Sequence, residues 1–195
     1  MIRHYFRRTF ILSLVFGMTI FLLPCGVFAQ DVAVAVDIKP GSCPNPMNVK
    51  SRGVLPVAIL GTPDVDETPG FDVTTIDPLT IILLVGETQV SPIRSSLEDV
   101  AAPYTGGIPE EPTCEECLES GPDGIMDLTL KFRTQDIVAA LSADIEGGTI
   151  IDGSCIVLEL TGLLTDSTPI TGQDVVRILI KGKVKPPNPH KPPKN

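Results

Sequence analysis

The sequence predicts an all-β fold, an antiparallel β-sandwich of Ig-like architecture with about seven to eight strands and one short helix. Short segments rich in β-branched residues recur along the chain, bounded by Gly, Pro, Asp or Ser. Helical periodicity is clear in one segment only. Turn signals separate the apolar segments at the intervals that are typical of sandwiches.

The strand assignments depend on β-branched composition and period-two alternation. The alternation is clearest in "DLTLKF", where Leu128, Leu130 and Phe132 share one face of a half-buried strand. Residues 134–141 form the expected helix, with Thr134 as a possible N-cap. The strong strand signals cover 32–38, 54–60, 80–85, 126–132, 155–160 and 174–180, with weaker ones near 71–76 and 90–96.

The two ends of the chain differ from its body. Residues 1–29 predict a secretory signal peptide, because three arginines precede a short apolar run and small residues end it. Residues 30–181 are the expected β-sandwich domain, with an acidic loop insert at 100–122, and 182–195 are a basic, Pro-rich, disordered tail. The expected location is secreted, meaning extracellular, periplasmic or cell-surface. A retained anchor and lipidation at Cys25 are the alternatives.

Charge is divided unevenly along the chain. Of the 15 Lys and Arg, three lie in the leader and five from Lys181 onward, so seven remain in the body against all 24 Asp and Glu. Such a body repels phosphate backbones, and we expect no nucleic-acid partner. The expected partner is an extracellular protein or a surface polymer. We expect a monomer without a membrane span once the signal is cleaved.

Four cysteines remain after the leader is removed, an even number that fits an oxidising compartment. The expected pairing is Cys43 with Cys155 across the fold and Cys114 with Cys117 inside a loop. A redox role for "CEEC" is disfavoured, because the two intervening glutamates oppose thiolate formation. A four-cysteine zinc site is the other alternative, and it lacks a second CxxC pair.

The residue types argue against several catalytic classes. The two histidines are His4, in the leader, and His190, in the tail, so the body has no histidine for a nucleophile–base system or a zinc site. The body also lacks tryptophan and has only Phe71, Tyr104 and Phe132 as aromatics, which disfavours a sugar-stacking platform. We therefore expect no enzyme.

One acidic stretch, "ESGPDGIMDL", matches the end of a calcium loop of the D-x-[DN]-x-D-G-x-x-D type. Asp123 and Asp127 would be side-chain ligands, Gly124 would permit the sharp turn, and Ile125 would supply its carbonyl. Glu119 stands at the first position of the local pattern, and a glycine stands at the third. A polar turn explains the stretch about as well.

Longer segments add a resemblance. "VDIKPGSCPNPMNVKSRGVLPVAILGT", "IRSSLEDV", "DGIMDLTLKFRTQDI" and "LTGLLTDSTPITGQDVVRI" together resemble a module of predicted secreted bacterial proteins, over roughly 34–180. In similar sequences "EDV" runs directly into a compact "NGDGxxDL" loop. The resemblance implies that Asp99 is the first calcium ligand, Asp123 the third and Asp127 the last. Here about twenty residues, including "CEEC", separate Asp99 from Asp123.

Two functions follow from these observations. The first is a secreted or cell-surface, non-catalytic β-sandwich module, stabilised by disulfides and calcium, that serves in adhesion, surface assembly or as an accessory domain. The second is a secreted hydrolase that uses Glu98, Asp99, Asp123 and Asp127 around a metal or a sugar.

Overall fold

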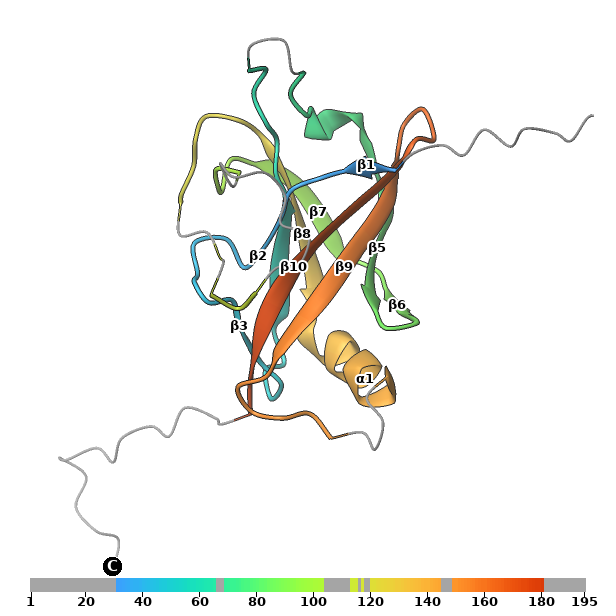
Figure 1. Ribbon diagram of the computed structural model, residues 1–195. Helices are drawn as coiled ribbons and strands as arrows, with labels where there is room; N and C mark the ends of the chain where they lie inside the picture. The colour runs from blue at the N-terminus through green and yellow to red at the C-terminus, as the bar shows by residue number, and fades with distance from the viewer. Residues whose placement is uncertain are drawn as a thin grey trace, which may run out of the picture.

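The computed structural model describes residues 31–65, 69–103, 113–115, 117, 120–144 and 149–180. Ten strands form two sheets that pack face to face, and one helix closes one end (Figure 1). The elements are β1 (Val32–Ala33), β2 (Val36–Ile38), β3 (Pro46–Asn48), β4 (Val54–Ile59), η1 (Val73–Thr75), β5 (Ile76–Val85), β6 (Thr88–Val90), β7 (Arg94–Glu98), β8 (Asp127–Arg133), α1 (Thr134–Asp144), β9 (Cys155–Leu164) and β10 (Pro169–Leu179). The expected all-β sandwich with one short helix is confirmed.

The two sheets differ in size and pairing. The larger sheet has the order β1-β10-β9-β5-β6, with β3 also paired to β10, and the smaller has the order β2-β4-β8-β7. β1 and β3 pair with β10 in parallel, whereas all other neighbours are antiparallel. The sandwich is therefore mixed, although antiparallel pairing dominates.

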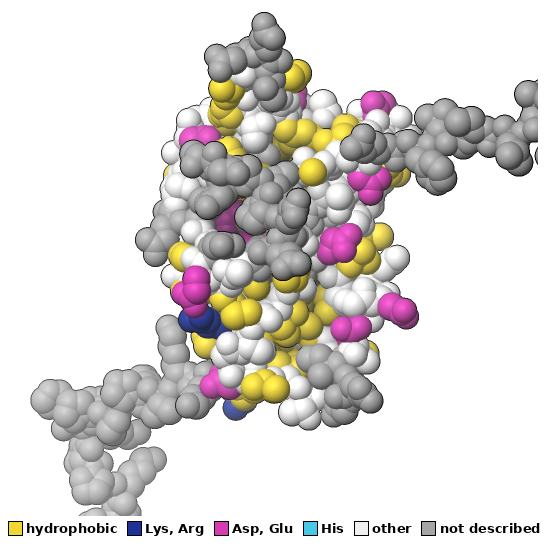
Figure 2. Space-filling model, viewed as in Figure 1, with side chains coloured by type: hydrophobic (Ala, Val, Ile, Leu, Met, Phe, Trp, Pro, Cys, Tyr) yellow, Lys and Arg dark blue, Asp and Glu magenta, His cyan; other side chains and the backbone are white. Residues whose placement is uncertain are grey.

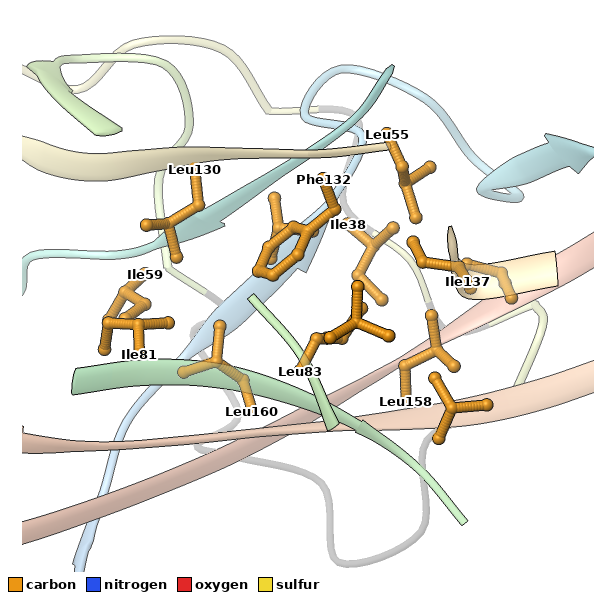
Figure 3. Packing of buried hydrophobic residues seen from close by; sticks show 14 of the residues in the cluster. Ile38, Leu55, Ile59, Ile81, Leu83, Leu130, Phe132, Ile137, Leu158 and Leu160 are labelled. Atoms are coloured by element: carbon orange, nitrogen blue, oxygen red, sulfur yellow. The ribbon is translucent and has the colours of Figure 1, made fainter. Parts of the chain in front are cut away.

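The core lies between the two sheets, where alternate side chains of each strand point inward. Leu130 and Phe132 of β8 face Leu83 of β5 and Leu160 of β9, and all four are fully buried (Figure 3). Ile137 of α1 closes the same cluster at one end. Burying each such side chain contributes about 1.5–3 kcal/mol, so these positions account for much of the hydrophobic stabilisation.

Several strands differ from the sequence-based expectation. The single run expected at 32–38 is two strands in different sheets, because the chain crosses the seam between β1 and β2. Half of residues 71–76 form the short helix η1, Ile76 begins β5, and β3 has no predicted counterpart. Local propensity does not predict β1 and β3, because both strands form by pairing with β10, which is distant in the sequence.

The crossing from β1 to β2 passes directly over Gly172 of β10. A Cβ atom added at Gly172 would lie 2.5 Å from the carbonyl oxygen of Val34 and 2.6 Å from Val36 Cγ2. A methyl group there would push the crossing away from the sheet. Only glycine lets the backbone approach this closely.

We expect Gly172→Ala to destabilise the fold by about 1–3 kcal/mol, because the clash is with backbone that cannot rotate away. The matched control is Gly121→Ala, since a Cβ there would have no atom within 4 Å. Thermal melting of the two variants checks the prediction. Equal melting temperatures would contradict the prediction, because they would show that the crossing can accommodate a methyl group at position 172.

Candidate functional site

The calcium-ligand candidates lie where two adjacent strands of the smaller sheet end and begin. Asp99 follows β7, and Asp123, Gly124 and Ile125 precede β8, its antiparallel neighbour. The Asp99 carboxylate accepts hydrogen bonds from the backbone N–H of Asp123 at 3.0 Å and of Gly124 at 2.8 Å. The insertion therefore leaves the two ends of the loop in contact.

The short turn before β8 is organised by the side chain of Asp123. Asp123 Oδ1 accepts the N–H of Ile125 at 2.9 Å, and Gly124 adopts a φ of 94°. That left-handed conformation favours glycine and makes the sharp turn possible. The carbonyl of Ile125 is the remaining candidate ligand of this turn. Glu119, the alternative first ligand, lies outside the described residues.

Asp127 has a different environment from the other candidates. It is fully buried, and its Oδ1 accepts the N–H of Gly61 at 3.0 Å. Its Oδ2 accepts the N–H groups of Val100 at 2.8 Å and Ala101 at 3.2 Å. Burial raises the pKa of Asp127, and these three backbone donors oppose the rise. Asp127 thus joins the end of β4 to the segment after β7.

The described residues contain no group of three or more His, Cys, Asp or Glu side chains placed to share a metal ion. The Asp99 carboxylate contacts the turn that holds Asp123, whereas both Asp127 oxygens are directed at backbone amides. Each Asp99 oxygen accepts one N–H group and keeps a second lone pair, whereas Asp127 Oδ2 already accepts two N–H groups. The structure brings Asp99, Asp123 and Ile125 together, with Asp127 anchored beside them.

A second group of buried polar residues joins the two sheets. Asp174 of β10 is 7% exposed, and its Oδ2 accepts the N–H of Ile38 on the edge of β2 at 2.6 Å. The same oxygen accepts Asn45 Nδ2 at 3.0 Å, and Oδ1 accepts its own neighbour, Val175 N–H. One carboxylate therefore holds the edge of the smaller sheet against the larger one. Burial raises the pKa of Asp174 to about 6, although the bonds from Ile38 and Val175 lower it.

Asp37 of β2 lies next to this seam and is 3% exposed. Its Oδ2 and Asn45 Oδ1 are buried acceptors with no hydrogen-bond partner among the described residues. Burial raises the pKa of Asp37 to about 7, and the charges of Asp174 and Asp127 raise it further. Near neutral pH this carboxyl group therefore holds its proton for part of the time.

Sequence reasoning missed Asp37, Asn45 and Asp174, although a signal for one of them was present. Period-two alternation in "QDVVRILI" puts Asp174 on the same face as Val176 and Ile178, which are core residues. A carboxylate on the core face of a strand indicates a buried, hydrogen-bonded role. No comparable local pattern marks Asn45.

The cysteines pair differently from the expectation. Cys43 bonds Cys117, and Cys114 bonds Cys155, with sequence separations of 74 and 41. The expected pairs Cys43–Cys155 and Cys114–Cys117 are wrong, because the loop does not close on itself and instead lies against β10. Cys114 Sγ contacts the carbonyl oxygen of Val176 on that strand. One bond ties the insertion to β9 of the larger sheet and the other ties it to the loop between β2 and β3, and each stabilises the fold by about 2–4 kcal/mol.

Arg177 supports the same contact between the insertion and the larger sheet. It forms an ion pair with Glu115, which lies between the two half-cystines of the loop. The hydrophobic and acidic surface over β9 and β10, with few Lys or Arg, is the face seen in Figure 2.

A hollow of about 440 Å³ lies beside the turn that contains Gly124 and Ile125. It is lined by the loop around Gly124, by Phe71, and by the carboxylates of Asp64 and Asp72. Asp64 accepts the N–H of Gly70 at 2.6 Å, and Asp72 caps η1 by accepting Thr74 N–H at 2.9 Å. Both acids therefore have a structural task at the rim of the hollow.

Comparison with protein-family models, with curated proteins and with solved structures finds no match for this chain. Within the described part of the chain, none of the helical segments has the length and apolar character needed to cross a bilayer. The predicted signal peptide and basic tail lie outside the described residues.

The raised pKa of Asp37 predicts a pH-dependent stability. The folded pKa of about 7 exceeds the ordinary value of 3.8, so the folded state binds the proton more tightly. The resulting stabilisation is complete below pH of about 4 and is lost as the pH rises through about 7. Asp37→Asn removes this loss, and we expect the variant to be more stable than the wild type at pH 8 by at most about 4 kcal/mol.

Denaturant unfolding of both proteins at pH 4.5 and pH 8 measures the effect. Asp174 contributes a smaller dependence of the same sign, so the variant should retain part of the slope. A difference between variant and wild type that does not depend on pH would contradict the raised pKa. Asp166→Asn is a control, because that exposed carboxyl has a lowered pKa and the opposite sign.

Proposed function

We propose that the protein is an exported, non-catalytic β-sandwich module that acts by surface contact, in adhesion, in surface assembly or as an accessory domain. The observation that carries the proposal is that its acidic side chains serve as hydrogen-bond acceptors within the fold. Asp64, Asp72, Asp99, Asp127 and Asp174 all accept backbone N–H groups of turns, strand edges or loop ends. Two disulfides that hold a long insertion also fit an oxidising compartment.

A carboxylate hydrolase is the competing function, and two observations bear on it. Asp37 and Asp174 have raised pKa values, a property that general acids often share. They are only 3% and 7% exposed, so a substrate has no direct access to either carboxyl group. Glu98 and Asp99 are accessible, but Glu98 accepts a hydrogen bond from Ser96, and Asp99 holds the turn. The contacts therefore favour structural roles.

Calcium is proposed as a stabilising ion at the turn formed by Asp99, Asp123 and Ile125. The support is the contact between the two ends of the loop and the left-handed Gly124, which together reproduce the sharp turn of a calcium loop. Asp127 would act mainly through its backbone contacts. An ion there would add a positive charge between strands β7 and β8, in the part of the fold that carries the insertion.

Thermal melting in EGTA and then in millimolar calcium tests the ion. A site at 100-fold saturation adds about 2.7 kcal/mol, which raises the melting temperature by several degrees. We expect Asp123→Asn to abolish that rise. Asp127→Asn should lower stability both with and without calcium, because the buried NH2 group replaces a carboxylate oxygen that accepts backbone N–H groups.

Two results separate these proposals. An unchanged melting temperature in calcium would remove the ion and leave the module proposal intact. Turnover of polysaccharide or peptide substrates by the folded protein, lost in Asp123→Asn without loss of stability, would replace the module with a hydrolase.

A further inference from the structure

The basic residues of the body are gathered at one end of the sandwich. Five of its seven Lys and Arg belong to the loop before β4, to β7 and to the end of β8, while the body carries all 24 acids of the chain. These five form what we call the basic face: Lys50, Arg52, Arg94, Lys131 and Arg133. All are exposed except Lys131, which is half-buried.

The strands of the smaller sheet align these side chains. Leu130 and Phe132 point into the core, so Lys131 and Arg133 point out of the sandwich. Arg94 of β7 lies directly opposite Lys131, and residues that are directly opposite share a face. Arg94, Lys131 and Arg133 thus lie on the outer side of β7 and β8, and Arg52 lines the same depression as Arg133.

Like charges directly opposite each other on neighbouring strands destabilise a sheet. No ion pair joins any cation of the basic face to a described carboxylate, although the body is strongly acidic. No described carboxylate forms an ion pair with Arg94 or Lys131, so both cations are available to a partner outside the fold.

The same surface is hollowed at its edge. A depression of about 460 Å³ is lined by Arg52, Arg133 and Gln135, with apolar Val54 and Ile93 beside them. Asp136 also lines it, without an ion pair to either arginine. Val54 is 44% exposed and Ile93 51% exposed, so apolar contact area accompanies the cations.

We propose that the basic face binds an anionic polysaccharide that carries carboxylate or phosphate groups along its chain. This inference rests on the proposed function and names the class of partner for its surface contact. Arginine and lysine match such groups by charge-assisted hydrogen bonds, and the exposed apolar side chains can cover the sugar rings between them.

The negative charge of the rest of the body favours a polysaccharide over an anionic membrane or a nucleic acid. A thin polymer can follow the basic face and stay away from the acidic surfaces, since screening acts over about 8 Å. An anionic membrane presents an extended surface that would also face the acids. Double-stranded DNA carries a charge every 1.7 Å or so, which maximises repulsion from the body, and single strands need aromatic platforms. The described aromatics, Phe71 and Phe132, are not part of the basic face.

The end of the chain favours the same partner. β10 ends at Leu179, which is in register with Asn48, two residues before Lys50. From Lys181 the sequence continues with five lysines and no acids. β10 therefore ends at the end of the sandwich that carries the basic face, which is also the end of α1 (Figure 1).

Binding of the full-length protein to polygalacturonate, in EGTA and at low ionic strength, tests the proposal. Neutral dextran, double-stranded DNA and vesicles containing phosphatidylglycerol serve as comparison partners. We expect binding to polygalacturonate that weakens with added salt, and no binding to dextran. Arg94→Gln and Lys131→Gln should each weaken binding about two- to fivefold.

The control variant is Arg177→Gln, which removes the same charge from the larger sheet and should leave the affinity unchanged. Melting temperatures distinguish lost contact from lost folding, because removing Arg94 or Lys131 relieves repulsion and should not lower stability. Absence of binding, equal losses in Arg94→Gln and Arg177→Gln, or tighter binding to vesicles or DNA would each overturn the proposal. None of these results bears on catalysis, so the proposed function is decided separately by the substrate assays.

Discussion

Buried carboxylates that accept backbone N–H groups hold this sandwich together where strand pairing ends. Asp127 accepts three such groups, from Gly61, Val100 and Ala101, and so fixes the exit of β4 against the start of the insertion. Asp174 accepts the N–H of Ile38 and joins the edge of one sheet to the other. An unpaired buried amide costs about 1–3 kcal/mol, so these contacts decide whether the edges can be buried at all.

The insertion depends on the same arrangement. Asp99 and Asp127 bring its two ends together, Cys114 attaches it to β9 of the larger sheet, and Cys117 attaches it to the loop between β2 and β3. The described residues of the insertion are consequently tied to both sheets. Burial of so many carboxylates has an electrostatic cost, which appears in the raised pKa of Asp37.

Much of the fold could be predicted from local pattern, and the missed features are the ones made by distant pairing. The alternation in "DLTLKF" placed Leu130 and Phe132 in the core because it needs only neighbouring residues. The division of 32–38 into β1 and β2 depends on β10, far along the chain. The disulfide pairing failed for the same reason, since the proximity of Cys114 to Cys155 arises only when the insertion lies on β10.

The role of Asp99, Asp123 and Asp127 as calcium ligands stays a prediction, although Asp99 contacts the backbone of Asp123. The burial of Asp37 and the hydrogen bonds of Asp174 could not be predicted from local pattern, because they require knowledge of both sheets. The alternation of its strand predicts that Lys131 points outward. Its position opposite Arg94 could not be predicted, because β7 and β8 pair across the insertion. The charge of the molecule is thus divided between acids that organise the fold and cations that remain available at one end.

Amide hydrogen exchange measured by NMR tests the central role of the buried carboxylates most directly. The N–H groups of Ile38, Gly61, Val100 and Ala101 should exchange as slowly as amides in the β4–β8 ladder, although carboxylates and not strands accept them. In Asp127→Ala, the amides of Gly61, Val100 and Ala101 should lose protection while that of Ile38 keeps it. Exchange of these four amides in the wild type at the rate of the exposed Gly121 amide would contradict the account.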